Sequence, residues 1–288
     1  MNHSAPHYQV GGAIQVGALY VKRHADRELV AALGKGEFCY ILAPRQIGKS
    51  SLRIRAGDDL MLSGIRCVSI DLSGIGTSQV TSDQWYYSIA YEIATALHLD
   101  DFDEFWEDHP ELSPVHRWYR FLRDQVLEHI HEPVVVFIDE VDSVLTLEFP
   151  TDDFFASIRA VYNLRAEYPN YERLTFCLLG VAAPSDLIQN PVRTPFNIGR
   201  EIRLEDFSRE EVTSFAAGLD AFGSVSHRIL DAVYAWTSGH PYMTQRLCNE
   251  LARRGPLQGN NPIDRVDEVA YALFIRSGRS GDATVAYA

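Results

Sequence analysis

Short apolar runs alternate with longer amphipathic stretches over the first two hundred residues of the chain. Runs rich in β-branched, aromatic and aliphatic residues predict strands over residues 38–42, 67–72, 134–138, 175–179 and 201–204. Helices are predicted between them, among others over residues 25–33, 49–61 and 151–167. Strands that alternate with helices indicate a parallel sheet with helices on its faces, which is an α/β fold. The run 134–138 is apolar throughout, as is typical of a strand buried on both faces.

The pattern changes after Phe207. Only helical patterns follow, over residues 208–219, 225–238, 242–254 and 262–275. Ser208, with Glu210 and Glu211 behind it, has the form of a helix N-cap with an acidic first turn. We therefore predict an N-terminal arm (residues 1–17), an α/β domain (18–207), a small all-helical domain (208–276) and a flexible tail (277–288).

Composition and charge narrow the function classes. Hydrophobic residues make up 46% of the chain and charged residues 23%, which is ordinary for a folded protein. The net charge of −13 leaves no overall basic surface, so we expect no nucleic-acid partner. No stretch approaches the roughly 18 apolar residues of a membrane span, and the N-terminus lacks the pattern of a secretory leader. We expect a cytoplasmic protein with no membrane partner.

The segment from Ala43 to Ser50 carries a strong chemical signal. It reads A-P-R-Q-I-G-K-S, which fits the pattern G-x-x-x-x-G-K-[ST] except at its first position, and it lies between a predicted strand and a predicted helix. A loop that closes on a helix N-terminus directs backbone N–H groups inward and forms an anion cradle. Gly48 allows close approach of phosphates, Lys49 is expected to reach the β- and γ-phosphates, and Ser50 to ligate Mg²⁺. The predicted binding residues of this P-loop are Pro44, Arg45, Gln46, Ile47, Gly48, Lys49, Ser50 and Ser51.

Two carboxylates follow the most apolar strand. Asp139 comes directly after the run 134–138 and is expected to hold the Mg²⁺ shell. Glu140 is expected to activate the attacking water as general base, with Lys49 as the second catalytic residue. Because ligands bind at the carboxyl ends of parallel strands, both motifs are expected to meet in one crevice. The sequence therefore predicts binding of ATP or ADP with Mg²⁺ and hydrolysis of ATP.

With these residues, the chain resembles the AAA-like domain of the STAND and AAA+ class of P-loop NTPases, and more narrowly the bacterial AAA-like domain proteins of the cyanobacterial type. The resemblance extends over residues 10–256. The segments that carry it are 36–42, 45–52, 137–145, 151–156 and 193–199. It implies a three-layer sandwich around a parallel sheet, followed by a small all-helical lid domain.

The resemblance also implies further site residues. Tyr20 and Val21 take the place of the family's adenine-lining segment, although His24 and Ala25 separate them from the expected Arg27-Glu28. Pro241, in Gly239-His240-Pro241, matches a lid proline that packs on adenine; the alternative is an ordinary first-turn helix proline. The residues expected to sense the γ-phosphate, from this chain or from a neighbouring copy, are Ser185, Arg193 and Arg200.

Three functions fit this site. The first is a STAND-type regulatory switch, which ADP holds closed and ATP opens, with slow Mg²⁺-dependent hydrolysis. The second is an AAA+ ATPase that remodels or loads a substrate as a ring. The third is a scaffold module that binds nucleotide without hydrolysing it, against which Glu140 argues. The expected partners are a nucleotide, further copies of the chain and an effector domain or protein.

Overall fold

The computed structural model of the chain describes residues 8–15, 17–188, 194–256 and 261–276. They form two compact units. We call residues 25–45 and 52–204 the sheet unit, and residues 1–24, 46–51 and 205–288 the helical unit, in each case meaning the described residues. The domain boundaries predicted at residues 17, 207 and 276 stay predictions, and the predicted tail lies outside the described residues.

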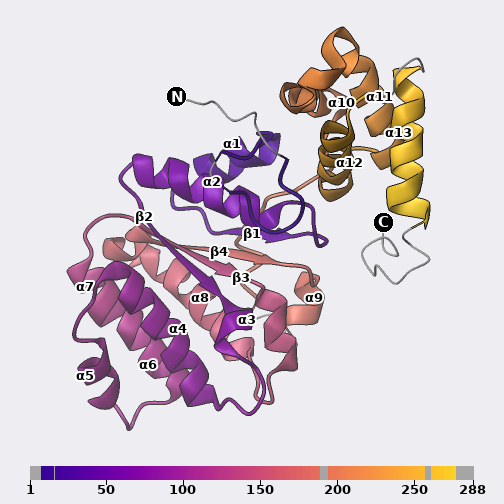
Figure 1. Ribbon diagram of the computed structural model, residues 1–288. Coiled ribbons are helices and arrows are strands. Elements are labelled where there is room, and N and C mark those ends of the chain that lie inside the picture. Colours follow the sequence, from indigo (N-terminus) through magenta and orange to yellow (C-terminus); the bar gives the residue numbers. More distant parts are fainter. Residues whose placement is uncertain (1–7, 16, 189–193, 257–260, 277–288) are drawn as a thin grey trace. The chain divides into compact units, whose positions relative to one another are not determined.

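Five parallel strands form the sheet of the sheet unit, in the order β2-β3-β4-β1-β5 (Figure 1). Their bounds are Cys39–Leu42 for β1, Arg66–Asp71 for β2, Val134–Asp139 for β3, Leu174–Gly180 for β4 and Arg200–Glu201 for β5. Neighbouring parallel strands need long crossover connections, which the helices between the apolar runs supply. The predicted α/β fold with a parallel sheet is confirmed.

Helices flank the sheet. Figure 1 shows α4, α6 and α8 on one face and α1 and α2 on the other. The helices are α1 (His24–Leu33), α2 (Lys49–Leu62), α3 (Leu72–Ile75), α4 (Ser82–Leu97), α5 (Phe102–Glu107), α6 (Pro114–Phe121), α7 (Leu127–His129), α8 (Asp152–Asn163) and α9 (Pro184–Leu187).

An aromatic core lies between the sheet and the helices α4, α6 and α8. Trp85, Trp118 and Phe154 belong to it, and each is at most 1% exposed. The indole Nε1 of Trp118 donates a hydrogen bond to the Ser157 hydroxyl at 3.0 Å, so its polar atom is satisfied inside the core.

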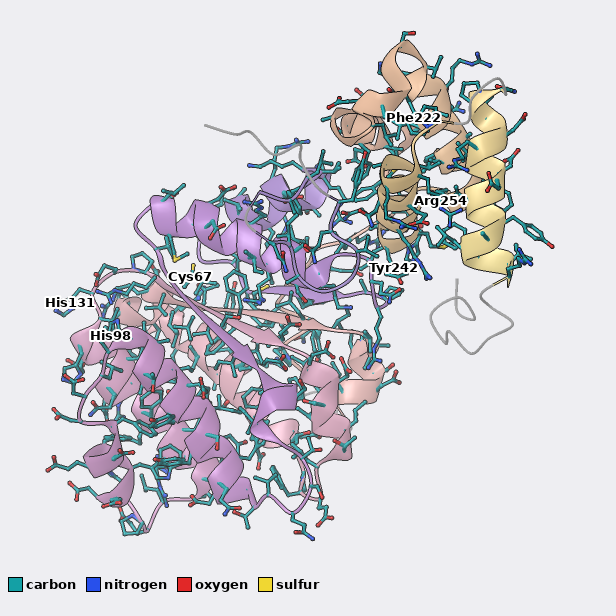
Figure 2. All side chains as sticks on the ribbon, viewed as in Figure 1. Cys67, His98, His131, Phe222, Tyr242 and Arg254 are labelled. Carbon is teal, nitrogen blue, oxygen red and sulfur yellow. The ribbon has the colours of Figure 1, made fainter. Side chains whose placement is uncertain are left out.

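The helical unit is built from helices around a second core. They are α10 (Arg209–Val212), α11 (Ser226–Thr237), α12 (Pro241–Arg254) and α13 (Pro262–Ala270). Ser208 caps α10 through a reciprocal pair of bonds with Glu211, which confirms the predicted N-cap. Figure 2 shows Tyr242 and Arg254, which lie near the two ends of α12. Tyr8 and Val21, from far upstream in the chain, are buried in this core.

Several predicted elements are shorter in the structure. The strand predicted over 201–204 is only Arg200–Glu201, because the chain leaves the sheet after the Ile202 N–H donates to the Tyr40 carbonyl. The helix predicted over 208–219 ends at Val212 and continues as a 3₁₀ turn, in which the Thr213 hydroxyl bonds the Glu210 carbonyl three residues back. The helices predicted over 151–167 and 262–275 likewise pass into a 3₁₀ and a π turn at their ends.

Candidate functional site

The carboxyl ends of β1, β4 and β3 share one edge of the sheet. Leu42, the last residue of β1, lies opposite Gly180 of β4, and Ile138 of β3 lies opposite Leu178. The Ala43 N–H donates to the Gly180 carbonyl at 3.0 Å, so the loop after β1 starts against the end of β4. The P-loop and Asp139 therefore both leave the edge at which parallel sheets bind ligands.

Asp139 is a buried carboxylate at the end of β3, 6% exposed. Its Oδ1 accepts a hydrogen bond from the Glu140 N–H at 3.0 Å. Its Oδ2 lies 3.4 Å from Nε of Arg53, on α2, and Arg53 also donates to the Ser69 hydroxyl of β2. A buried carboxylate loses its hydration, which costs free energy unless other groups compensate its charge. The guanidinium of Arg53 provides part of this compensation.

Glu140 has a left-handed backbone, with φ 53° and ψ 44°. For a residue with a Cβ this conformation costs about 1–3 kcal/mol, and such strain is concentrated at functional sites. Glu140 is half-buried and precedes the 3₁₀ helix Val141–Thr146. The strain lies at the residue that was predicted to be the general base.

The end of β4 is fixed by Asp142. The Asp142 Oδ1 accepts a hydrogen bond from the Val181 N–H at 2.8 Å. A Cβ on Gly180 would lie 2.7 Å from Val141 Cγ2 and 2.8 Å from the same Oδ1, so only glycine fits there. Ser185, the predicted sensor, lies in α9, is exposed and has its hydroxyl 3.5 Å from Asp186 Oδ1.

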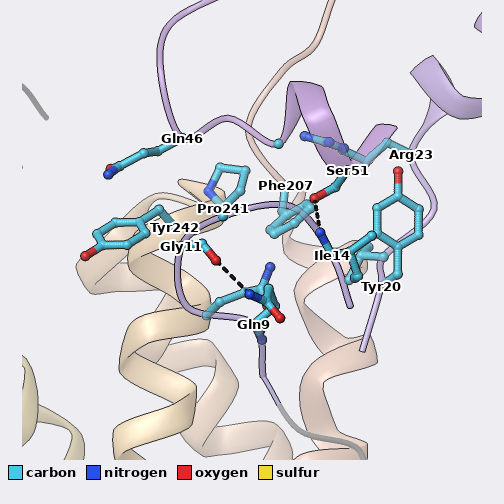
Figure 3. A pocket seen from close by; sticks show the side chains of 14 residues that line it. Gln9, Gly11, Ile14, Tyr20, Arg23, Gln46, Ser51, Phe207, Pro241 and Tyr242 are labelled. Atoms are coloured by element: carbon cyan, nitrogen blue, oxygen red, sulfur yellow. Dashed lines mark hydrogen bonds between the residues drawn. The ribbon is translucent and has the colours of Figure 1, made fainter. Parts of the chain in front are cut away.

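A cavity of about 80 Å³ lies within the helical unit (Figure 3). One water needs roughly 10–15 Å³, so the cavity has room for a larger group. Its lining combines aliphatic and aromatic surfaces with amides and one arginine. The lining residues are Gln9, Gly11, Gly12, Ile14, Tyr20, Val21, Arg23, Gln46, Gly48, Ser51, Phe207, Pro241, Tyr242 and Gln245.

Six predicted binding residues thus meet at one cavity. They are Tyr20, Val21, Gln46, Gly48, Ser51 and Pro241. Lys49 is the first residue of α2 and is 7% exposed, and Ser50 is half-buried beside it. Ile47 is 6% exposed, whereas Pro44 and Arg45 are exposed. The P-loop residues from Gln46 onward belong to the helical unit, and Asp139 and Glu140 to the sheet unit.

Arg23 holds the P-loop backbone, and the sequence analysis missed it. Its Nη1 donates to the Ile47 carbonyl at 2.9 Å and to the Glu205 carbonyl at 3.2 Å, and its Cζ lies 5.2 Å from the centre of the Phe207 ring. A Cβ on Gly48, which has φ 97°, would lie 2.9 Å from Arg23 Nη2. The signal available in the sequence was an arginine two residues after Val21.

The arginines considered earlier lie elsewhere. Arg27 is exposed, and Glu28 pairs with Arg200 at 2.9 Å. Arg200 also pairs with Glu37 at 3.1 Å, and it lies opposite Cys39, the first residue of β1. That is about 10 Å along the strand from its carboxyl end. A role of Arg200 toward a neighbouring copy stays a prediction, and Arg193 lies outside the described residues.

The acidic residues suit a metal ion whose coordination shell is completed by the phosphates of a bound nucleotide and by water. Among the described residues, no group of three or more His, Cys, Asp or Glu side chains could hold a metal ion by itself. Mg²⁺ is usually bound through one or two protein oxygens, with phosphates and waters completing its shell, which a single buried Asp139 fits. In the part of the chain that the structure describes, no helix combines the length and apolarity needed to cross a bilayer.

Comparison with known proteins agrees with this architecture. The family model of the AAA-like domain matches residues 10–258. A protein of Synechocystis sp. named as an uncharacterized WD repeat-containing protein is 40% identical over an alignment of 288 positions, which covers 96% of this chain and 24% of that protein. The chain thus spans about a quarter of the length of this relative.

Two solved structures share the fold. A Walker-type ATPase of Pyrococcus abyssi has a TM-score of 0.54 at 18% identity, over 91% of this chain and 75% of that one. AMPPCP-bound DnaA from Aquifex aeolicus has a TM-score of 0.50 at 15% identity, over 86% of this chain and 67% of that one. At such identities the likeness concerns the fold alone. The chain belongs to the AAA-like domain family and has the fold of the P-loop ATPases.

Proposed function

We propose that the chain is a STAND-type switch that binds ATP or ADP with Mg²⁺ and hydrolyses ATP slowly. One observation carries the proposal: Gln46 and Gly48 of the P-loop line the same cavity as Pro241 and Tyr242 of α12. A nucleotide in this cavity would touch both the phosphate loop and the helical domain. Its affinity would then depend on how the helices are arranged, which is the requirement for a ligand-driven switch.

The cavity lining suits an adenine nucleotide. Val21, Phe207 and Pro241 offer apolar surfaces to a planar base, and the amide nitrogen of Gln245 offers a donor. The φ of Gln46 is 64° and that of Gly48 is 97°, so this loop departs from extended backbone where it must curve around an anion. Lys49, at the start of α2, would neutralise the phosphates together with the helix N-terminus.

Ser50 and Asp139 would hold the metal, which supplies charge neutralisation of the phosphates when bound. Glu140 would take a proton from the attacking water while the water oxygen bonds to the γ-phosphorus. The bond between the γ-phosphorus and the bridging oxygen of the β-phosphate would break, which yields ADP and phosphate. The left-handed backbone of Glu140, next to the buried Asp139, supports this role, because strained conformations are concentrated at functional sites.

The partners of such a switch would be an effector and other copies of the chain. The Synechocystis relative has WD repeats by name, and this chain matches only 24% of it, which supports a regulatory domain that works beside other modules. The runner-up function is a ring-forming remodelling ATPase, which would need an arginine from a neighbouring copy, with Arg200 as the described candidate.

Nucleotide content and assembly state separate these functions. The purified protein would be denatured and its nucleotide identified by ion-exchange chromatography, and its mass in solution measured with ADP and with a non-hydrolysable ATP analogue. We expect retained ADP on a form that assembles only with the analogue. Rapid turnover by an empty, preassembled ring would favour the remodelling ATPase, and no affinity for either nucleotide would overturn the proposal.

A further inference from the structure

The segment 8–14 is tied to the helical core at its start. Tyr8 is 5% exposed, and its hydroxyl donates to the Phe215 carbonyl at 2.7 Å. A Cβ on Gly218 would lie 2.5 Å from the Tyr8 ring, so the glycine leaves the socket that this ring fills. The Gln9 N–H donates to Oε1 of Gln245, on α12, at 2.9 Å. These contacts fix the start of the segment on the helical domain.

The other end of the segment is tied to the P-loop helix. The Ile14 N–H donates to the Ser51 hydroxyl at 3.1 Å, and Ile14 is 9% exposed. Between the two ends, Gly11 (φ 78°) and Gly12 (φ 68°) turn the backbone through the left-handed region, where residues with a Cβ are strained. Figure 3 shows Gln9, Gly11 and Ile14 along the ribbon that borders the cavity, with the bonds Gln9–Gly11 and Ile14–Ser51 dashed.

This segment is therefore part of the cavity wall. Gln9, Gly11, Gly12 and Ile14 all line the cavity, and they lie on one continuous stretch held by α12 at one end and by Ser51 at the other. Ser51 directly follows Ser50, the proposed metal ligand, so the anchor lies one residue from the phosphate site. A ligand that fills the cavity contacts this wall as it enters and leaves.

We infer that residues 8–14 form an N-terminal strap that closes the nucleotide pocket and sets the rate at which nucleotide leaves it. The inference rests on the proposed function and adds a regulatory element to the same site. Breaking the strap's anchors or its glycine turn opens the wall without removing a phosphate-binding residue. A switch that retains ADP needs slow release, and the strap supplies the barrier.

The test is the dissociation rate of a fluorescent ADP analogue, chased with excess unlabelled ADP in a stopped-flow instrument, on the full chain. The first variant is Gly11→Ala/Gly12→Ala. An added Cβ meets nothing within 4 Å at Gly11 and only Gln9 Nε2 at 4.0 Å at Gly12, so the substitutions strain the turn without a clash with other protein atoms. We expect dissociation roughly tenfold faster or more, since each left-handed residue with a Cβ is penalised.

Gly64→Ala is the matched control. Gly64 has φ 80° and no atom within 4 Å of its would-be Cβ, and it lies in the sheet unit. Its variant is expected to release the analogue at the rate of the unmodified chain. A second strap variant, Tyr8→Phe, removes only the hydroxyl bond to Phe215 and is expected to release it about threefold to tenfold faster.

The outcomes separate the two proposals. Faster release by both strap variants, with Gly64→Ala unchanged, supports the strap. Release at the unmodified rate by both strap variants overturns it and leaves nucleotide binding standing. Failure of the unmodified chain to bind the analogue overturns the proposed function, and the strap's role falls with it.

Discussion

The Nε atom of Arg53 lies 3.4 Å from Oδ2 of Asp139. Arg53 stands on α2 one helical turn after Lys49, and Asp139 ends the central strand β3. The side chains are 21% and 9% exposed, so the pair is largely shielded from water. A positive side chain beside the proposed metal ligand links the charge state of the site to the stability of the fold.

Arg53→Met is expected to destabilise the chain by about 1–3 kcal/mol, because it removes a partner of a buried carboxylate. Arg66→Met is the matched control, since Arg66 pairs with Glu132 at 3.0 Å at the opposite end of β2 and β3 but with 40% and 47% exposure. An exposed pair of this kind contributes about 0–1 kcal/mol. Urea unfolding measures both, and equal losses would contradict the special role of Arg53.

Lys49→Ala is expected to weaken ATP and ADP binding on the order of 100-fold or more, because it removes the cation proposed to neutralise the phosphates. Titration with a fluorescent nucleotide measures the affinity. Lys35→Ala, at an exposed lysine after α1, is the control and should bind as the unmodified chain does. Tight binding of ATP by Lys49→Ala would contradict the assignment of Lys49 to the phosphate site.

Glu140→Gln is expected to keep nucleotide affinity within a few fold and to lower ATP turnover by roughly 100-fold or more, since the amide cannot accept the proton. Phosphate release measures turnover. Glu148→Gln changes an exposed glutamate beyond the same 3₁₀ helix and is expected to leave turnover unchanged. Undiminished turnover in Glu140→Gln would exclude Glu140 as the general base.

Gly239→Ala is expected to destabilise the helical unit by about 3 kcal/mol or more and to weaken nucleotide binding. A Cβ there would lie 1.9 Å from the Phe207 carbonyl oxygen, and the Phe207 N–H donates to the Gly239 carbonyl at 2.9 Å. This contact joins Phe207 to the turn that begins two residues before Pro241, and Phe207 and Pro241 both line the cavity. Gly255 has φ 68° and ψ −177°, and no atom lies within 4 Å of its would-be Cβ. Gly255→Ala should therefore cost only the backbone strain of about 1–3 kcal/mol and spare binding. Thermal unfolding and nucleotide titration of both variants test this.

Glu250, on α12, makes the stability of the helical unit depend on pH. A hydrogen bond from Arg253, and a second one from Arg254, lower the pKa of Glu250 from 4.5 to about 2. They outweigh the burial of the carboxyl group, which by itself would raise this pKa. A depressed carboxyl pKa contributes stability that is full above pH 4.5 and is lost as pH falls toward 2. Glu250→Gln should therefore be less stable than the unmodified chain at pH 7, with the difference shrinking between pH 4.5 and pH 2. A difference independent of pH, measured by urea unfolding, would contradict this.

Local patterns in the sequence determined the elements and the motifs. The apolar run 134–138 became β3, Val134–Asp139, and the P-loop stretch led into α2 at Lys49 as predicted. Such features depend on neighbours within a few positions, because strand burial, helix starts and phosphate loops are set by local periodicity and backbone freedom. The α/β class and the family follow from them.

Tertiary structure alone decided which distant residues share a site. The strand order places β4 between β1 and β3. The side chain of Arg23, rather than that of Arg27, bonds to the P-loop backbone. Tyr8 is buried against Phe215. Gln9 and Ile14, in the segment predicted to be an N-terminal arm, line the cavity. Tyr8 and Phe215, for example, are 207 positions apart in the chain. Contacts over such separations do not follow from the local hydrophobic periodicity that predicts helices and strands.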